Sequence, residues 1–185
     1  MIWHILYVLC CFLFDQILIL LFPSSYLLQQ MIFVPSLGFC AIMLTVRKFD
    51  LLSGVLFAFG FGLFYELFFS QTFMIYPLVY SLCVVLLKYW SKQVGYSLVE
   101  SMLLCSILIF IKDLIVYLCM LITKISKLSF INWLCNIELL SIGINTLLII
   151  LIFFFLNRKD DLLMRKNIRL KSQEKLSLDI FKFQK

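Results

Sequence analysis

Residues 54–66 read GVLFAFGFGLFYE and lie within a long apolar run. Four of these residues recur at intervals of four, which places them on one face of a helix. They are Gly54, Ala58, Gly62 and Glu66. Small residues in such a row let a second helix approach closely inside a membrane, and an acid is costly in contact with lipid. The sequence therefore predicts a membrane helix whose small-residue face packs against protein.

The composition excludes an ordinary soluble domain. Of the 185 residues, 64% are hydrophobic and 14% are charged, whereas a globular domain has about half and about a quarter. The apolar runs do not alternate as barrel strands do, and they approach the roughly 20 residues that a membrane helix needs. The predicted fold class is all-α, in a polytopic membrane protein.

Six hydrophobic segments form one predicted transmembrane domain over residues 1–156. The first carries Asp15 and lacks a basic n-region and a small-residue cleavage site, so we expect it to be retained. Pro35 is predicted to begin a short second helix, because proline suits a first turn and not a helix interior. The segments cover residues 2–22, 26–46 (with its helix over 34–46), 51–69, 74–87, 96–122 and 133–156.

Lysine and arginine are distributed unevenly between the predicted loops. With six helices, thirteen fall on one side and only Lys124 and Lys127 on the other. The positive-inside rule places the basic side, and with it both termini, in the cytoplasm. The tail over residues 157–185 is predicted to be solvated and partly helical, with contact to anionic lipid or a cytosolic partner as the alternative. The thirteen are Arg47, Lys48, Lys88, Lys92, Arg158, Lys159, Arg165, Lys166, Arg169, Lys171, Lys175, Lys182 and Lys185.

Charged residues at membrane depth are the natural candidates for function. Lys112 could pair with one acid, which would lower the cost of burying both charges, and an acid left over would be protonated. Three hypotheses stay open: buried hydrogen bonds that hold the bundle together, coordination of a partner helix, and a transport or proton pathway. The predicted polar cluster consists of Asp15, Glu66, Lys112, Asp113 and Glu138.

No catalytic, cofactor or metal site is predicted. His4 is the single histidine and is expected at an interface, and the sequence contains no HExxH, GxSxG, phosphate-loop or dinucleotide motif. The seven cysteines lie in or beside apolar segments without a CxxC pair, so we expect them to pack. The basic excess sits in a tail beside a membrane helix, which makes nucleic acid a poor explanation for the charge.

The run over residues 33–80, FVPSLGFCAIMLTVRKFDLLSGVLFAFGFGLFYELFFSQTFMIYPLVY, resembles the MreD family of small polytopic membrane proteins of the bacterial rod-shape machinery. In that family a proline opens a short second helix, as Pro35 would, and a polar cytoplasmic link follows. A glycine-rich helix then ends in a G-x-x-x-D-like element, to which the GLFYE that ends at Glu66 is similar. Two positions depart from the pattern, because Glu66 replaces the usual aspartate and Met74 stands where glycine is frequent.

The resemblance implies a non-enzymatic scaffold of the bacterial cell membrane that organises peptidoglycan synthesis during cell elongation. Its implied partners are an MreC-like bitopic membrane protein, the MreB filament, and the cell-wall polymerase and transpeptidase. The expected mechanism is docking of a partner helix along the face from Gly54 to Glu66. Packing of that face within the chain stays open, as does a homodimer. The family's fold is similar to the substrate-binding subunits of energy-coupling-factor vitamin transporters, so such a subunit is the alternative function.

Overall fold

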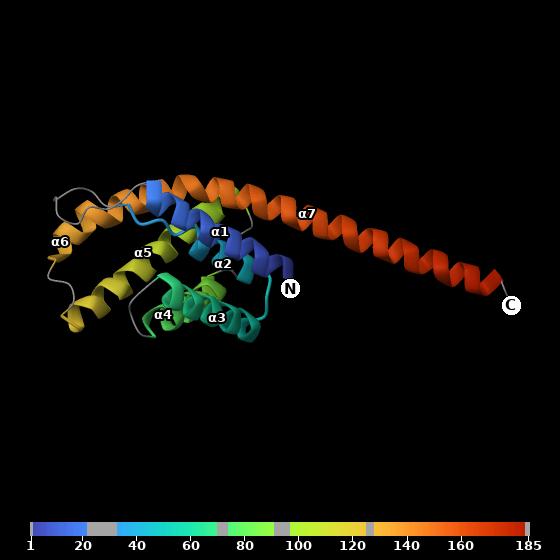
Figure 1. Cartoon of the computed structure of the whole chain (residues 1–185), viewed down its shortest axis with the longest axis horizontal. Coiled ribbons are helices and arrows are strands. Elements are labelled where there is room, and N and C mark those ends of the chain that lie inside the picture. The colour runs from blue at the N-terminus through green and yellow to red at the C-terminus, as the bar shows by residue number, and fades with distance from the viewer. Residues whose placement is uncertain (1, 22–32, 70–73, 91–96, 125–127, 184–185) are drawn as a thin grey trace. The chain divides into compact units, whose positions relative to one another are not determined.

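In the part of the chain that the computed structural model describes, all regular secondary structure is helical (Figure 1). Two compact units divide the chain, Met1–Phe153 and Phe154–Lys185. The charged residues of the predicted polar cluster and the face from Gly54 to Glu66 all lie in the first unit. The described residues are 2–21, 33–69, 74–90, 97–124 and 128–183, with side chains as far as Arg165. The side chains of the tail beyond Arg165 and the loop lysines Lys92 and Lys127 lie outside this range.

Within the described residues, four helical stretches are long and apolar enough to cross a membrane, by their length and composition. They are α1 (Ile2–Leu21), α3 (Leu51–Phe69), α5 (Leu98–Ile122) and the run Phe130–Arg165. Two further apolar helices are shorter, α2 (Leu37–Val46) and α4 (Ile75–Trp90). The prediction of an all-α fold built from apolar helices is therefore confirmed.

The last long run contains a change of helix type. It consists of α6 (Phe130–Trp133), a π-helical turn (Leu134–Glu138) and the start of α7 (Leu139–Phe183). The helix predicted to begin at residue 133 therefore begins at Phe130, because the Ser129 side chain accepts a hydrogen bond from the backbone N–H of Asn132 and so caps it.

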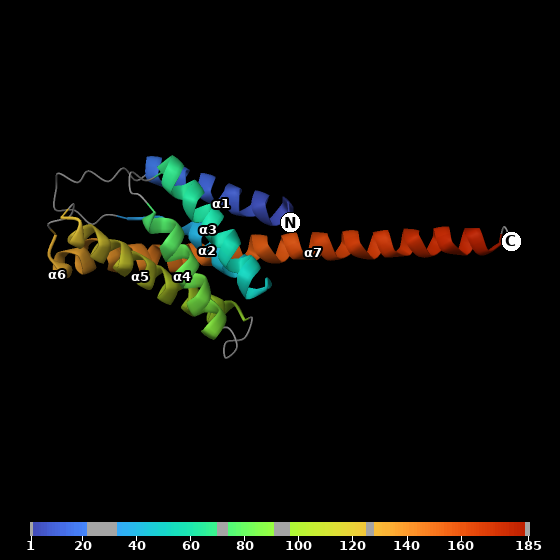
Figure 2. The same cartoon turned by 90° about the horizontal axis from the view of Figure 1, so that it is seen from below.

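The short helix α2 forms the centre of the first unit. All ten of its residues are buried, and it packs against α1, α3, α4 and α5. At its contact with α1, a Cβ added to Gly38 would overlap the ring of Phe12. The outer helices also pack in pairs, and α3 and α4 lie side by side (Figure 2). A helix that is apolar all round, as α2 is, can be stable only when it is enclosed in this way.

Pro35 does not begin α2. The helix starts two residues later, at Leu37, and Ser36 occupies the capping position with a φ of −141°. Residues 33–36 are not helical, because side chains from other helices hydrogen-bond to their backbone, as described below. The prediction of a helix-opening proline is wrong in detail, although Pro35 does lie in the non-helical segment directly before α2.

Among the described residues, two other than glycine adopt positive φ. Met74, immediately before α4, has a φ of 61°, and Lys124, just after α5, has a φ of 57°. The left-handed region costs an L-residue about 1–2 kcal/mol, because the Cβ crowds the backbone. The conformation at Met74 is therefore one that glycine would adopt without this cost.

Replacing Met74 with glycine should stabilise the protein. Relief of the strained φ outweighs the extra freedom of glycine in the unfolded chain, which leaves a net gain of up to about 1 kcal/mol. This gain corresponds to a rise in melting temperature of about 2–4 °C, measurable by thermal unfolding in detergent. Val85→Gly, at a half-exposed position inside α4, should lower it instead. A lower melting temperature for Met74→Gly would contradict the assignment of strain.

Candidate functional site

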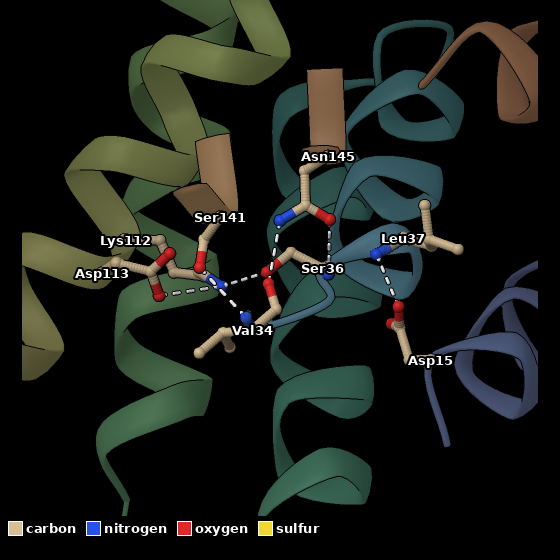
Figure 3. A network of polar contacts seen from close by, with 8 residues as sticks. All are labelled: Asp15, Val34, Ser36, Leu37, Lys112, Asp113, Ser141 and Asn145. Carbon is tan, nitrogen blue, oxygen red and sulfur yellow. Dashed lines mark hydrogen bonds and ion pairs between the residues drawn. The ribbon is translucent and has the colours of Figure 1, made fainter. Parts of the chain in front are cut away.

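The start of α2 is held by the carboxylate of Asp15. One oxygen, Oδ1, accepts a hydrogen bond of 2.8 Å from the backbone N–H of Leu37, and Oδ2 accepts one of 2.8 Å from that of Gly38. The first N–H groups of a helix have no partner within the helix, and no water satisfies them in an apolar interior. Asp15, which is 3% exposed, supplies both acceptors and a negative charge at the positive end of the helix dipole (Figure 3).

Two side chains of α7 bind the non-helical backbone before α2. Asn145 accepts a hydrogen bond of 3.0 Å from the N–H of Ser36 and donates one of 2.9 Å to the carbonyl of Val34. Ser141 accepts one of 3.0 Å from the N–H of Val34. Pro35, between them, has no N–H to satisfy. The amide and hydroxyl of α7 therefore replace the backbone partners that a helix would have provided, as Figure 3 shows.

A buried lysine completes the arrangement. Lys112 of α5 donates a hydrogen bond of 2.7 Å to the hydroxyl of Ser36 and lies 3.0 Å from Oδ1 of Asp113. Its ammonium group also lies 5.3 Å from the ring centroid of Phe39, a favourable position for a cation over an aromatic face. The ion pair lowers the cost of burying either charge. The hydrogen bond to Ser36 connects α5 to the non-helical residues 33–36 before α2.

The other end of α2 receives a positive charge. Lys88 of α4 donates hydrogen bonds from Nζ to the carbonyls of Arg47 and Phe49, the residues that follow the helix. Arg47 in turn donates a 3.2 Å hydrogen bond from Nη1 to the hydroxyl of Ser101. With Asp15 at the N-terminus and Lys88 at the C-terminus, both ends of α2 carry the charge that its dipole favours.

Replacing Lys88 with methionine should destabilise the protein by about 1–2 kcal/mol. The change keeps the length of the side chain but removes the donor that reaches two carbonyls at the end of α2. Thermal unfolding should show a fall of about 3–6 °C. The control is Lys48→Met, at an exposed position in the same loop, which should shift the melting temperature little. Equal shifts for the two variants would contradict the capping role.

Glu66 performs for α4 what Asp15 performs for α2. Its Oε1 accepts a hydrogen bond of 3.2 Å from the backbone N–H of Ile75, the first residue of α4. Glu66 is 7% exposed, so this N–H is satisfied in an apolar setting. In both cases an acid on a long helix binds the beginning of the short helix that follows it.

The face from Gly54 to Glu66 is filled by helices of the same chain. A Cβ added to Gly62 would lie 2.6 Å from Cα of Pro77 in α4, and one added to Gly54 would lie 2.6 Å from Cγ1 of Val46 in α2. Ala58 is fully buried. The close helix packing expected of this face is present, but the helices that it receives are α4 and α2. Of the alternatives left open for this face, packing within the chain is the one seen at Gly54 and Gly62, where other helices of the chain occupy the space.

The structure divides the predicted polar cluster. Asp15, Lys112 and Asp113 lie where residues 33–36 lead into α2, through the contacts described above. Glu66 instead binds the start of α4. Glu138 is buried at the end of the π-helical turn. Sequence reasoning did not identify Ser36, Ser141, Asn145 and Lys88 as members of this network. A signal for two of them existed, since Ser141 and Asn145 are polar residues four apart on one face of an apolar helix.

The cavity between α4 and α5 has a volume of about 230 Å³ and is lined by apolar side chains. It offers no charged group to a polar ligand. Within the described residues, no group of three or more His, Cys, Asp or Glu could hold a metal ion. The residues that line the cavity between α4 and α5 are Met74, Ile75, Leu78, Val79, Leu82, Ile115 and Cys119.

Comparison with protein-family models, with curated proteins and with solved structures found no match. The functional proposal therefore depends on the contacts described above and on the resemblance of residues 33–80.

Proposed function

We propose that the protein is a non-enzymatic integral membrane scaffold of the bacterial cell-elongation machinery, similar to MreD. The observation that carries the proposal is that polar side chains in the apolar helices hydrogen-bond to the backbone of the same chain. Asp15, Asn145 and Glu66 bind backbone groups of the chain itself, so their chemistry supports a rigid helical body. Such a body can present fixed surfaces to membrane partners, and the proposal includes no catalytic step.

The vitamin-transporter subunit is the less favoured function. A polar vitamin needs hydrogen-bonding side chains directed into a cavity, whereas the cavity between α4 and α5 is lined by apolar side chains. The two functions differ in a simple measurement. The scaffold should show no change in melting temperature with a panel of water-soluble vitamins, and a saturable rise with one of them would support the transporter subunit instead.

In the proposed topology all six apolar helices cross the bilayer, with both termini in the cytoplasm. The helix α2 has ten residues and is about 15 Å long, which is half of the roughly 30 Å of hydrocarbon. The non-helical residues 33–36 would supply more of the crossing, and buried side chains satisfy their backbone, as membrane depth requires. A reporter fused to the C-terminus should be active in the cytoplasm only, and activity outside the cell would exclude this topology.

A partner helix needs a surface other than the filled face of α3. We place it on the opposite, outward side of the same helix, around Gly60. A Cβ added to Gly60 would meet no atom within 4 Å, and its neighbours Leu56 and Leu67 are 64% and 80% exposed. A glycine between exposed leucines lets a second helix come close. The partner proposed for this surface is the transmembrane helix of an MreC-like protein.

Replacing Gly60 with leucine should weaken this association without unfolding the protein. The side chain has open space in the isolated chain, but it would separate two closely packed helices. We expect at least a tenfold loss of affinity, equivalent to about 1.4 kcal/mol, measured by co-purification of the MreC-like protein from native membranes. The cells should also lose their rod shape.

Gly143→Leu on α7 provides the matched control, because this glycine also has open space around it. It should leave co-purification and cell shape unchanged. Normal co-purification and normal cell shape for Gly60→Leu, with the variant protein present at wild-type level, would contradict docking at this surface.

A further inference from the structure

Arginine residues recur along one face of α7 directly after its apolar part. The apolar part ends at Leu156, and Arg158 and Arg165 follow at exposed positions. Leu162, between the two arginines, is 64% exposed. The helix continues without a break to Phe183. Spacings of four and three residues place Arg158, Leu162 and Arg165 on one face of this helix.

The helical register extends this face and keeps the acids of the tail off it. Arg169 follows Arg165 by four residues, so its position belongs to the same face. We call Arg158, Leu162, Arg165 and Arg169 the arginine stripe. The acids occupy other positions around the helix, with Asp160 and Glu174 opposite the stripe and Asp161 and Asp179 to one side of it.

The first arginine of the stripe leans back toward the apolar part of the helix. Its Cζ lies 5.2 Å from the ring centroid of Phe154, one turn earlier. Side chains of a helix tilt toward its N-terminal end, so a cation placed after a membrane helix leans toward the bilayer. Its stem can then cover apolar surface while its charge lies among the headgroups. Phe154 is 52% exposed, which leaves much of its ring available to lipid.

The second arginine of the stripe also lies within reach of headgroups. Arg165 follows Arg158 by seven residues, which is about 10 Å along the helix axis. The headgroup layer is about 5–8 Å deep on each side of the hydrocarbon. A long side chain that leans back along the helix covers the remaining distance. Both arginines can therefore contact the same membrane surface.

We propose that the arginine stripe binds the headgroups of anionic phospholipids. Guanidinium groups suit phosphate oxygens, because they are always charged and can donate two parallel hydrogen bonds. Each cation near an anionic membrane surface adds to the affinity, and the exposed Leu162 adds apolar contact between the charges. The inference rests on the proposed topology, in which the apolar part of α7 crosses the bilayer and the stripe follows it on the cytoplasmic side.

The lipid selectivity of the purified full chain tests this proposal. Native mass spectrometry can compare its affinities for dioleoyl phosphatidylglycerol and dioleoyl phosphatidylcholine, which share their acyl chains and a phosphate but differ in net charge. The wild type should bind the anionic lipid at least about fivefold more tightly. Arg158→Gln combined with Arg165→Gln should remove this preference, and it should leave the affinity for phosphatidylcholine and the melting temperature unchanged.

The matched control is Lys171→Gln combined with Lys175→Gln. This variant removes two charges from the same helix at positions outside the stripe, and it should keep the preference for phosphatidylglycerol. Equal losses in the two double variants would show a response to net charge alone. A preference that survives in the arginine variant would assign the stripe to another ligand, such as an acidic protein. Either result, or a wild type without the preference, would overturn the proposal.

This measurement is independent of the scaffold function. It contains no MreC-like protein, so normal lipid selectivity combined with a failure of docking at Gly60 would contradict only the scaffold. A C-terminal reporter that is active outside the cell would exclude the proposed topology, whatever the lipid selectivity. Loss of the selectivity in the wild type alone would contradict only the role of the arginine stripe.

Discussion

One methyl group added at Gly62 should destabilise the protein more than a whole leucine side chain added at Gly60. The Cβ at position 62 would lie 2.6 Å from Cα and 2.8 Å from N of Pro77. These are backbone atoms, so α3 and α4 would have to move apart along their contact. We expect Gly62→Ala to cost about 3 kcal/mol and Gly62→Leu to prevent the two helices from packing. Unfolding in increasing denaturant measures both.

The same helix provides two internal comparisons. Gly60→Ala meets no atom within 4 Å and should raise stability by up to about 1 kcal/mol, because alanine favours the helix. Gly54→Ala should fall between the two, since its closest obstacle is a side-chain methyl group of Val46, which can shift. Equal stabilities for Gly62→Ala and Gly60→Ala would contradict the close contact between α3 and α4.

Removal of the carboxylate at Asp15 should produce the second large effect. In Asp15→Ala the N–H groups of Leu37 and Gly38 lose their acceptors inside an apolar bundle. At about 1–3 kcal/mol for each unsatisfied group, the expected loss is about 2–6 kcal/mol. The melting temperature should fall by about 10 °C, as measured in detergent or nanodiscs.

Asparagine at position 15 tests the geometry of this cap. Its amide keeps one acceptor oxygen but turns an NH₂ group toward the other N–H, so Asp15→Asn should lose part of the stability that Asp15→Ala loses. Asp161→Asn, on an exposed residue, provides the neutral control. An Asp15→Ala protein with the stability of this control would show that the start of α2 does not depend on the carboxylate.

The sequence predicted the long helices well because their signal is local. The segment over residues 51–69 coincides with α3, since apolar length alone defines a membrane helix. Pro35 was predicted to begin the second helix, which in fact begins two residues later, at Leu37. The beginning of α2 at Leu37 depended on Asn145 and Ser141, which are more than 100 residues away, and no local pattern reports such a contact.

The charged residues buried within the helices were predictable as candidates for the site, but their arrangement and their uncharged partners were not. The four-residue spacing from Gly54 to Glu66 defines a face, and it cannot identify the helix that fills that face. Buried acids were predicted to be functional candidates, and Asp15 and Glu66 do accept hydrogen bonds within the chain. Their partners are backbone N–H groups, which every residue except proline carries and which therefore leave no mark in the sequence.

The order of synthesis also determines when each hydrogen bond around α2 can form. A ribosome delivers Asp15 before Leu37, so the first cap can form as soon as this helix enters the bilayer. Lys88 arrives about 40 residues later, and Asn145 only after more than 100. Until then the backbone at Val34 and Ser36 has no side-chain partner from α7. A nascent chain halted before α7 should therefore stay vulnerable to proteases, and resistance to them should coincide with synthesis of α7.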